Sequence, residues 1–380
     1  MMPQSQFIRS RLLKQVLAAT TFFSLVYFSL NNLLPAIRYN VVPHRHPVLH
    51  DNAQSEASLG TTVSSPTVHL VIASTKADDT SWTSRLRIPN LTILRYISDD
   101  PSAPFHPPKP KGREALMCKP AHPSPKPQTQ EANPNHSKPD FTYLHDFYDS
   151  LPDLTLFIHA SETPWHVEGT LLRNTSFALS QLNLHQVLQQ RPYFNLRVTW
   201  RAGCPAWIDT TKTHADYDEA EEPFMAEAWR ANFGADEPVP EKLGGPCCSQ
   251  FAVTREAIRR RPREQYRFSR DWIVDSTWSD AILGRVWEHM WPRLFTDEAS
   301  DCGHAERGSL CQMYGVCFES EGELDGYKEL WEERERLKER MSFLRAVWDA
   351  KKAAGAKGRF GEVNDEIERQ LSVAWRRGHA

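Results

Sequence analysis

The sequence predicts an α/β protein in which one mixed, Rossmann-like β-sheet forms a single domain, preceded by a transmembrane helix and followed by a helical tail. Apolar runs typical of buried strands at Val68–Ala73, Leu91–Ile97 and Leu154–Ile158 predict the sheet, because helix-like or polar segments separate them. An apolar stretch near the N-terminus predicts the membrane helix. A heptad-like pattern after residue 319 predicts the tail.

Composition bounds the class of protein. The chain has 380 residues, more than one ordinary domain needs, and 40% of them are hydrophobic, enough for one sizeable core. A formal net charge of −3 gives no sign of a nucleic-acid partner. The sequence lacks GxxxxGK[ST], GxGxxG, HExxH and GxSxG, which argues against P-loop, dinucleotide-binding, zincin and serine-hydrolase sites.

The N-terminus predicts a type II membrane protein. Residues 16–34 are mostly apolar and nearly long enough to cross a bilayer, and Arg9, Arg11 and Lys14 precede them. Basic residues on this flank keep residues 1–15 in the cytosol. Residues 16–34 are therefore predicted to be a signal anchor, with residues 35–66 as a stem and the rest of the chain lumenal, in the Golgi or the endoplasmic reticulum. A cleaved signal peptide is the alternative.

Sequons and cysteines agree with a lumenal location. Glycan-acceptor triplets begin at Asn90, Asn135 and Asn174. Six of the seven cysteines fall in the second half of the chain, which suits disulfides: Cys204, Cys247, Cys248, Cys302, Cys311 and Cys317. We expect the adjacent Cys247 and Cys248 to pair with different partners and Cys118 to be left over. A zinc site at Cys302, His304, Cys311 and Cys317 is the alternative.

The lumenal α/β domain is predicted to cover residues 67–318, with a disordered, proline-rich insertion at residues 99–140. Only Gly112–Met117 looks helical within the insertion, so the insertion divides one helix that runs from Arg113 to Tyr148. A retained intron in the gene would give the same pattern. Further elements are expected as follows: helices at Ser81–Arg87, Gly169–Gln190, Phe224–Phe233 and Ala281–Phe295, strands at Asn195–Trp200 and within Gly244–Val253, and a helix capped by Thr254 and stopped by Pro262.

Residues 319–380 are predicted to form the helical tail. Its apolar residues recur at heptad spacing if Arg334 is counted: Tyr327, Leu330, Leu337, Met341, Leu344 and Trp348. The helix then packs on its own domain, or forms a short coiled coil in a homodimer. The charged end after Ala353 is expected to fray.

The strongest candidate site follows the strand Leu154–Ile158. His159, Glu162, Trp165 and His166 lie just beyond its carboxyl end, where α/β folds bind ligands. These polar groups could bind a substrate's hydroxyls or phosphates, and Trp165 could stack on a sugar or base. His159 and His166 could also hold a divalent metal ion. The structural alternative is that a histidine at a strand end is only a hydrogen-bonded boundary residue.

Charged residues elsewhere could complete the site. Arg113 at a helix start and Arg255 directly after a strand could bind phosphate, although a charged helix run is more often a solvated face. Glu288 and Asp280 could act as the catalytic general base, against the simpler roles of a solvated carboxylate and a helix cap. The Asp216-Tyr217-Asp218 triplet and the pair Asp99-Asp100 are weaker candidates for a metal site.

Several separated motifs occur in a recognisable order. They are GREA at 112–115, YDSLPD at 148–153, FIHASETPWH at 157–166, NLR at 195–197, CP at 204–205, CCSQFAVTREAIRRRP at 247–262, LGRVWEHMWPRLF at 283–295 and YGVCF at 314–318. From Val68 to Phe318 the chain therefore resembles a family of mostly fungal proteins known as domain of unknown function 3431. The proline-rich insertion departs from that family's pattern, and the heptad tail lies outside the resemblance.

More distantly, the layout resembles glycosyltransferases of the GT-A type: signal anchor, stem, two early strands, a strand ending in polar residues, and a late strand followed by a helix. This resemblance implies transfer of a sugar from a nucleotide donor to a hydroxyl acceptor such as a glycan, with a divalent cation such as Mn²⁺ as cofactor. The family usually ends the matching strand in a metal-binding Asp-x-Asp, whereas His159-Ala160-Ser161 stands here. A non-catalytic lumenal carbohydrate-binding or scaffold protein and a metal-dependent hydrolase are the alternative functions.

Overall fold

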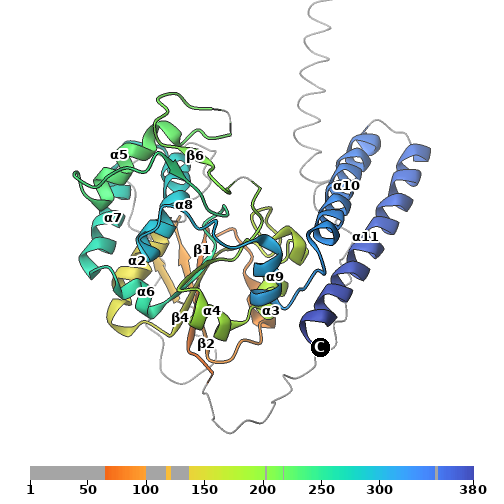
Figure 1. Ribbon diagram of the computed structural model, residues 1–380, viewed down its shortest axis with the longest axis horizontal. Coiled ribbons are helices and arrows are strands. Elements are labelled where there is room, and N and C mark those ends of the chain that lie inside the picture. The colour runs from red at the N-terminus through yellow and green to blue at the C-terminus, as the bar shows by residue number, and fades with distance from the viewer. Residues whose placement is uncertain (1–64, 100–116, 121–136, 202, 217, 347–349) are drawn as a thin grey trace, which may run out of the picture. The chain divides into compact units, whose positions relative to one another are not determined.

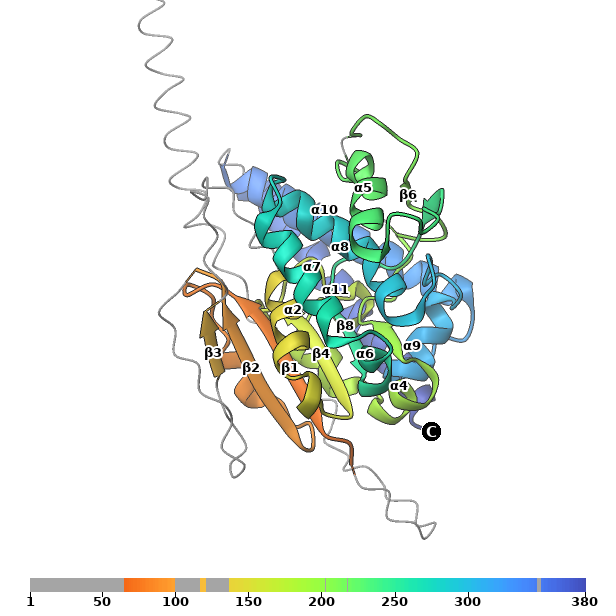
Figure 2. The same ribbon diagram turned by 90° about the vertical axis from the view of Figure 1, so that its left-hand side faces the viewer.

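A six-stranded mixed sheet in the order β3-β2-β1-β4-β8-β5 lies at the centre of the α/β domain (Figures 1 and 2). The computed structural model describes residues 65–99, 117–120, 137–201, 203–216, 218–346 and 350–380. The strands are β1 (Val68–Ser74), β2 (Leu91–Ile97), β3 (Met117–Pro120), β4 (Leu154–His159), β5 (Tyr193–Asn195) and β8 (Phe251–Thr254). Strands β1 to β4 are parallel, and β8 runs antiparallel to both β4 and β5, so the prediction of a mixed sheet is confirmed.

Helices cover both faces of the sheet, which is why all six residues of β4 are buried. One face, with Leu70 and Leu156, shares a hydrophobic cluster with residues of η1 (Ser81–Arg85), α3 (Thr175–Gln181), α4 (Leu184–Gln190), α9 (Glu306–Tyr314), α10 (Glu321–Ala346) and α11 (Ala350–Gly378). The other face, with Val71 and Phe157, packs against α2 (Ser137–Asp146), α5 (Glu222–Phe233), α6 (Arg255–Arg259), α7 (Arg263–Asp275) and α8 (Asp280–Thr296). Alternate residues of β1, β2, β4, β5 and β8 therefore enter two separate hydrophobic clusters.

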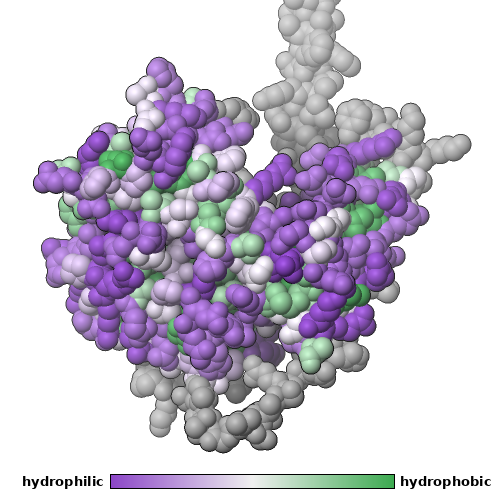
Figure 3. Space-filling view, in the orientation of Figure 1, coloured by the Kyte–Doolittle hydropathy of each residue, from purple (hydrophilic) through white to green (hydrophobic). Residues whose placement is uncertain are grey.

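The remaining described elements are short: η2 (Tyr148–Ser150), η3 (Gly169–Leu171), and β6 (Ile208–Asp209), which pairs with β7 (Lys242–Leu243). In the view of Figure 3 the surface of the described residues is mostly hydrophilic, with hydrophobic residues in small separate groups. The described residues contain no helix that is long and apolar enough to cross a membrane. The predicted span at residues 16–34 and the predicted stem lie outside the described residues.

Several predicted elements form with close to their expected bounds. Strands β1, β2, β4 and β8 and helices α5 and α8 appear where the apolar patterns predict them. The hydroxyl of Thr254 accepts a hydrogen bond from the Ala257 amide at 3.2 Å, so the predicted helix cap is confirmed. Pro262 then separates α6 from α7.

Other elements differ from the prediction. Met117–Pro120 forms an edge strand and α2 begins at Ser137, so the single helix from Arg113 to Tyr148 and the wholly disordered insertion are both wrong for the described part of this segment. The expected helix at Gly169–Gln190 is instead η3, α3 and α4. The side chains of Asn174 and Asn183 cap α3 and α4, and such caps mark separate helix starts.

All three disulfides of the described residues lie in the second half of the chain. Cys204 pairs with Cys302, and Cys311 pairs with Cys317. The three cysteines of the alternative zinc site are divided between these two disulfides, so in this oxidised state they offer no thiolate to a zinc ion. Cys247 pairs with its neighbour Cys248, so the expectation of different partners is also wrong.

The tail is a pair of long helices, and the expectation of a frayed end is wrong. Helix α11 continues to Gly378 and buries Val363, Ile367 and Leu371 in the same cluster as Tyr327 and Trp331 of α10. The buried Arg334 lies over the Trp331 ring at 4.5 Å from its centroid and donates to Asn364 of α11. Tyr327, Leu330, Arg334 and Leu337 of the heptad seam thus pack within the chain, and a homodimer stays a prediction.

The three sequons differ in their surroundings. Asn174 is buried, and its carbonyl oxygen accepts from the Phe177 amide at 2.8 Å, so a glycan there would remove a helix cap. Asn90 is exposed in the turn before β2, and Asn135 lies outside the described residues. In a secretory expression host, we expect Asn90→Gln to remove a glycan and Asn174→Gln to remove none, as measured by intact mass before and after glycosidase treatment. A mass shift that depends on Asn174 would contradict this burial.

Candidate functional site

The strand order creates a topological switch point between β1 and β4. From β1 the chain continues to β2 on one side of the sheet and later returns as β4 on the other side of β1. In open parallel sheets, ligands bind beyond the carboxyl ends of the strands at such a point. His159, the last residue of β4, pairs in register with Ala73 near the end of β1, so the histidine predicted from the sequence lies at this switch point, the place called the crevice below.

The segment after β4 is held against η1. The Trp82 indole donates to the Ala160 carbonyl at 2.9 Å, and Arg85 pairs with Glu162 at 2.5 Å. The Glu162 carbonyl also accepts from the Thr175 amide. Glu162 thus lies at the rim of the site with its carboxylate already engaged, which favours a positioning role over ligand binding.

His159, His166 and Trp165 form an aromatic group at the crevice. The His159 and His166 ring centroids are 4.8 Å apart, and the Trp165 ring lies 4.1 Å from that of His166. The indole of Trp165 is 63% exposed, whereas His159 is buried. An exposed ring beside two imidazoles is a surface on which a sugar or base could stack.

Burial keeps both imidazoles neutral near pH 7. It lowers the pKa of His159 to about 4, and burial together with the nearby His159 and Arg197 lowers the pKa of His166 to about 3. His159 Nε2 lies 3.1 Å from the Cys248 carbonyl, which can only accept, so Nε2 carries the proton. The buried Nδ1 of His166 has no hydrogen-bond partner among the described residues, which leaves it available to a ligand.

Arg197 and Glu168 were not identified from the sequence. Glu168 is buried, and its carboxylate accepts from the amides of Thr170, Val198 and Thr199 at 2.9–3.0 Å. It thereby fixes the chain that follows β5, which carries Arg197 into the crevice. The NLR motif at 195–197 marks Arg197 as part of the family pattern, but its place in the site depends on tertiary folding, because it lies beyond the end of β5.

Helix α8 and the turn before β8 close the site from the other side of β4. The Glu288 carboxylate accepts from the Cys248 amide at 2.5 Å, and Gln250 accepts from the His159 amide at 3.3 Å. Arg197 Nη1 lies 2.8 Å from Cys247 Sγ and 3.3 Å from Cys248 Sγ. Burial raises the pKa of Glu288, although its side chain keeps some solvent exposure. Glu288 and His159 thus both contact the backbone of Cys248, which places Glu288 on the same side of the sheet end as the histidines.

Three predicted site residues lie elsewhere or cannot be placed. Asp280 is in the first turn of α8, eight residues from Glu288 and so about 12 Å away along the helix axis. Arg255 contacts Asp153 and the Leu151 carbonyl at the amino end of β4, about 16 Å along the strand from His159. Arg255 therefore helps to hold the starts of β1 and β4 together, because Asp153 before β4 also accepts hydrogen bonds from Thr67 before β1. Arg113 lies outside the described residues.

The acidic candidates for a metal site are not part of the crevice. Asp216 pairs with Lys212 in an exposed loop, and Tyr217 between the two aspartates lies outside the described residues. Asp99 accepts from the Lys76 amide at 2.8 Å beside the ends of β1 and β2. Asp100 lies outside the described residues, and the described carboxylates of these two candidates are not grouped around one point.

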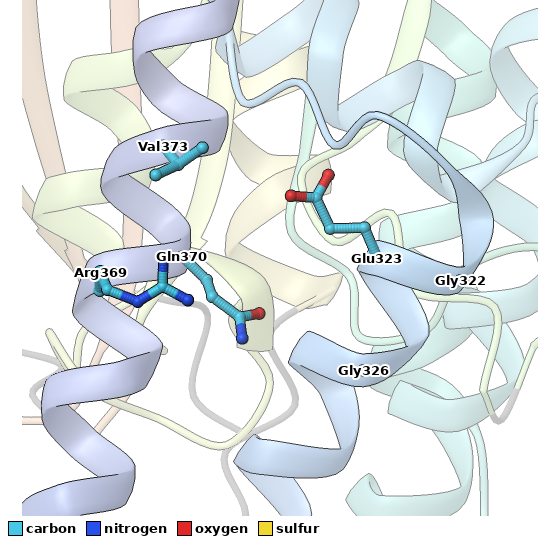
Figure 4. A pocket seen from close by; sticks show the side chains of 6 residues that line it. All are labelled: Gly322, Glu323, Gly326, Arg369, Gln370 and Val373. Carbon is cyan, nitrogen blue, oxygen red and sulfur yellow. The ribbon is translucent and has the colours of Figure 1, made fainter.

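A separate pocket of about 220 Å³ lies between α10 and α11 (Figure 4). Gly322 and Gly326 of α10 face Arg369, Gln370 and Val373 of α11 across it. Its charged groups already have partners: Glu323 pairs with Arg377 at 2.6 Å, and Arg369 pairs with Glu366 at 2.5 Å. The pocket is therefore a gap between helices where glycines replace larger side chains, and it offers no unpaired charge to a ligand.

The lowered pKa values of His159 and His166 predict a pH dependence of stability. In the unfolded chain both rings protonate near pH 6.5, but in the folded protein they stay neutral to about pH 4 and about pH 3. Their stabilising contribution is therefore present above about pH 6.5 and is lost as the pH falls. We expect the free energy of unfolding to drop by about 1.4 kcal/mol per histidine per pH unit below about pH 6. Denaturant unfolding between pH 7.5 and 5 measures it. His159→Gln/His166→Gln should reduce the slope, and part of it should remain because burial also lowers the pKa of His69 to about 4. An unchanged slope would contradict the assignment.

Comparison with known proteins identifies one family, and the function of that family is unknown. A family model described as "Protein of unknown function (DUF3431)" matches residues 70–118 and 121–312. No curated protein and no solved structure matches the chain. The matched region covers the sheet and both helical layers up to α9, and it includes the whole site at the end of β4.

Proposed function

The chain belongs to the DUF3431 family, whose function is unknown, and we propose that its α/β domain transfers a sugar from a nucleotide donor to a hydroxyl acceptor. The observation that carries the proposal is the grouping of His159, His166, Arg197 and Glu288 with the exposed Trp165 at the switch point of the sheet. We further propose that the chain is a type II membrane protein of the Golgi or the endoplasmic reticulum, as its N-terminal sequence predicts.

The layout of the domain supports a glycosyltransferase-like function. Two early strands, β1 and β2, flank the short helix η1, and β4 ends in polar residues at the crevice. β8 follows a glycine-containing turn and leads into α6. This is the arrangement that the distant resemblance to GT-A glycosyltransferases implies, and it is a fold-level analogy.

The donor would bind between the histidines and Arg197. The Arg197 guanidinium supplies positive charge for a diphosphate, and the exposed Trp165 ring supplies a surface for the sugar. The residues at the end of β4 do not fit Mn²⁺, which prefers several oxygen ligands. The Glu162 carboxylate is engaged by Arg85, and His159 Nε2 donates to a carbonyl. No step of the proposed transfer is therefore assigned to a metal ion.

Glu288 is the best placed general base. A raised pKa brings a carboxylate closer to neutral pH, where general bases work most efficiently, and the side chain keeps some solvent exposure. The amide of Cys248 fixes one carboxylate oxygen. The second oxygen would then accept the proton of the acceptor hydroxyl as its oxygen attacks the sugar and the nucleoside diphosphate leaves.

A donor screen tests the proposal. The purified full-length chain is incubated with the common nucleotide-sugars and a mixture of glycan acceptors, with and without Mn²⁺, and released nucleotide is measured by liquid chromatography. Thermal shifts with each donor give an independent measure of binding. We expect one donor class to stabilise the protein and to be turned over. Absence of both responses for every donor would reject the proposal.

A non-catalytic carbohydrate-binding protein is the second candidate. The observation in its favour is that Trp165 presents an exposed ring while the Glu288 carboxylate is held by a backbone amide. Binding on a glycan array without any nucleotide-sugar turnover, and with no effect of Glu288→Gln, would favour it.

A further inference from the structure

Two cysteines and a carboxylate meet beside the crevice. Cys247 and Cys248 come from the turn before β8, and Glu288 comes from the middle of α8. Their Sγ and carboxylate oxygen atoms all lie within 4.8 Å of one another, and both cysteines are buried. Two thiolates and a carboxylate on one side of a small space are a ligand set for a borderline-soft divalent cation.

The surroundings of Arg197 point to sulfurs that carry negative charge. Arg197 Nη1 lies within 3.3 Å of both sulfur atoms, and its buried Nε has no hydrogen-bond partner among the described residues. Sulfur in a disulfide is a weak, uncharged acceptor and a poor partner for a guanidinium whose burial is costly. The carboxylates of Glu168 and Glu288 already act on the charge of Arg197, and two thiolates would add direct charge-assisted contacts at Nη1, which are stronger than neutral ones.

We propose that Cys247 and Cys248, once reduced, bind a divalent cation of the Zn²⁺ class together with Glu288. An exogenous dithiol supplies the two electrons: its two sulfurs become a disulfide as the Cys247–Cys248 bond breaks, and its two protons pass to the cysteines. Cation binding then releases these protons, so that the metal is held by two thiolates and one carboxylate. The remaining position of a four-coordinate cation is open to water or another ligand.

The charges balance in this state. Two thiolates and a carboxylate carry three negative charges, the cation carries two positive charges, and the Arg197 guanidinium supplies the third. The ligands, the cation and Arg197 together therefore carry no net charge, which favours binding at a partly buried site, and Glu168, which also acts on Arg197, lies outside this set.

Reduction of the Cys247–Cys248 disulfide should destabilise the protein less than reduction of the Cys204–Cys302 disulfide. A disulfide stabilises chiefly by restricting the unfolded chain, and the effect increases with the length of the loop that it closes. Cys247 and Cys248 are adjacent, whereas 98 residues separate Cys204 from Cys302. The adjacent pair can thus be reduced while its surroundings keep their structure.

Metal binding by the full-length chain tests the inference. Oxidised and dithiol-reduced protein are dialysed against Zn²⁺, and bound zinc is measured by mass spectrometry. Cys247→Ala/Cys248→Ala reports the background from the other cysteines. We expect the reduced chain to bind one equivalent of zinc more than the reduced double variant. The oxidised chain should bind no more zinc than that variant. Equal binding by the reduced chain and the variant would overturn the proposal.

Two single substitutions of carboxylates on α8 test whether Glu288 is the third metal ligand. Glu288→Gln keeps an oxygen that can accept from the Cys248 amide, so it preserves the turn, and it should weaken zinc binding by more than about tenfold. Asp280→Asn is the matched control and should leave binding unchanged. Co²⁺ gives a second readout, because thiolate ligation produces a charge-transfer band in the near ultraviolet. Equal zinc affinity of the two variants, or absence of that band, would also overturn the proposal. Both readouts are independent of sugar transfer, so this site and the proposed function can fail separately.

Discussion

Glu288→Gln is expected to lower nucleotide-sugar turnover by about a hundredfold or more while leaving donor binding nearly unchanged. Removing a positioned general base typically costs about 10²–10⁴ in rate. The glutamine oxygen can still accept from the Cys248 amide, which Glu288 contacts at 2.5 Å, so the turn before β8 should keep its shape. The amide has no basic oxygen with which to take up the acceptor's proton, and the loss should therefore appear in kcat rather than in donor affinity.

Asp280→Asn is the control for this experiment. Asp280 lies on the same helix in its first turn, about 12 Å from Glu288 along the axis, so its turnover should match that of the unmodified chain. The pH profile gives a further test, because the acidic limb of kcat should disappear in the Glu288 variant. If the two variants lose turnover equally, or if Glu288→Gln retains full activity, Glu288 is not the base.

The elements that sequence predicts well are those with a strong local pattern. The fully buried strand β4 contains an unbroken apolar run, and Thr254 is a cap residue directly before a helix. Helix α3 shows the limit of such patterns, because the run from residue 169 to 190 is helical in composition. The segment is divided into separate helices because the side chains of Asn174 and Asn183 cap two helix starts. An asparagine within a helical pattern does not by itself indicate such a cap. Edge strand β3 is four residues long within a proline-rich segment, and its pairing with β2 is a tertiary effect.

The candidate site could be predicted only where the chain itself brings residues together. His159, Trp165 and His166 are within eight positions of each other, and their order after a buried strand indicates a site. Arg197 and the Cys247–Cys248 pair reach the same place from β5 and β8, and this requires the antiparallel placement of β8 beside β4. Arg255 shows the converse. It follows β8 directly, but because β8 is antiparallel its end lies at the amino end of β4, away from His159.

Trp291→Ala is expected to give the largest loss of stability in the α/β domain, about 3–5 kcal/mol. Trp291 is fully buried on α8, and its ring centroid lies 5.0 Å from both Phe141 and Phe251, which join helix α2 and strand β8 to it. Its indole also donates to the Ser249 hydroxyl at 3.1 Å. Removal leaves a cavity between three elements and deprives that hydroxyl of its donor, and most domains have a total stability of only about 5–15 kcal/mol.

Denaturant unfolding of the full chain measures this effect, with Trp165→Ala as the matched control. Trp165 is 63% exposed, so the same truncation there should change the free energy of unfolding by less than about 0.5 kcal/mol. If Trp291→Ala does not fold, Trp291→Phe keeps the ring contacts and should show an intermediate loss. Trp291 also lies one turn from Glu288 on α8, and its partner Ser249 follows Cys248. The Trp291 variants should therefore loosen the Cys248–Glu288 contact as well, and equal stability of the Trp291 and Trp165 variants would contradict this role for the aromatic core.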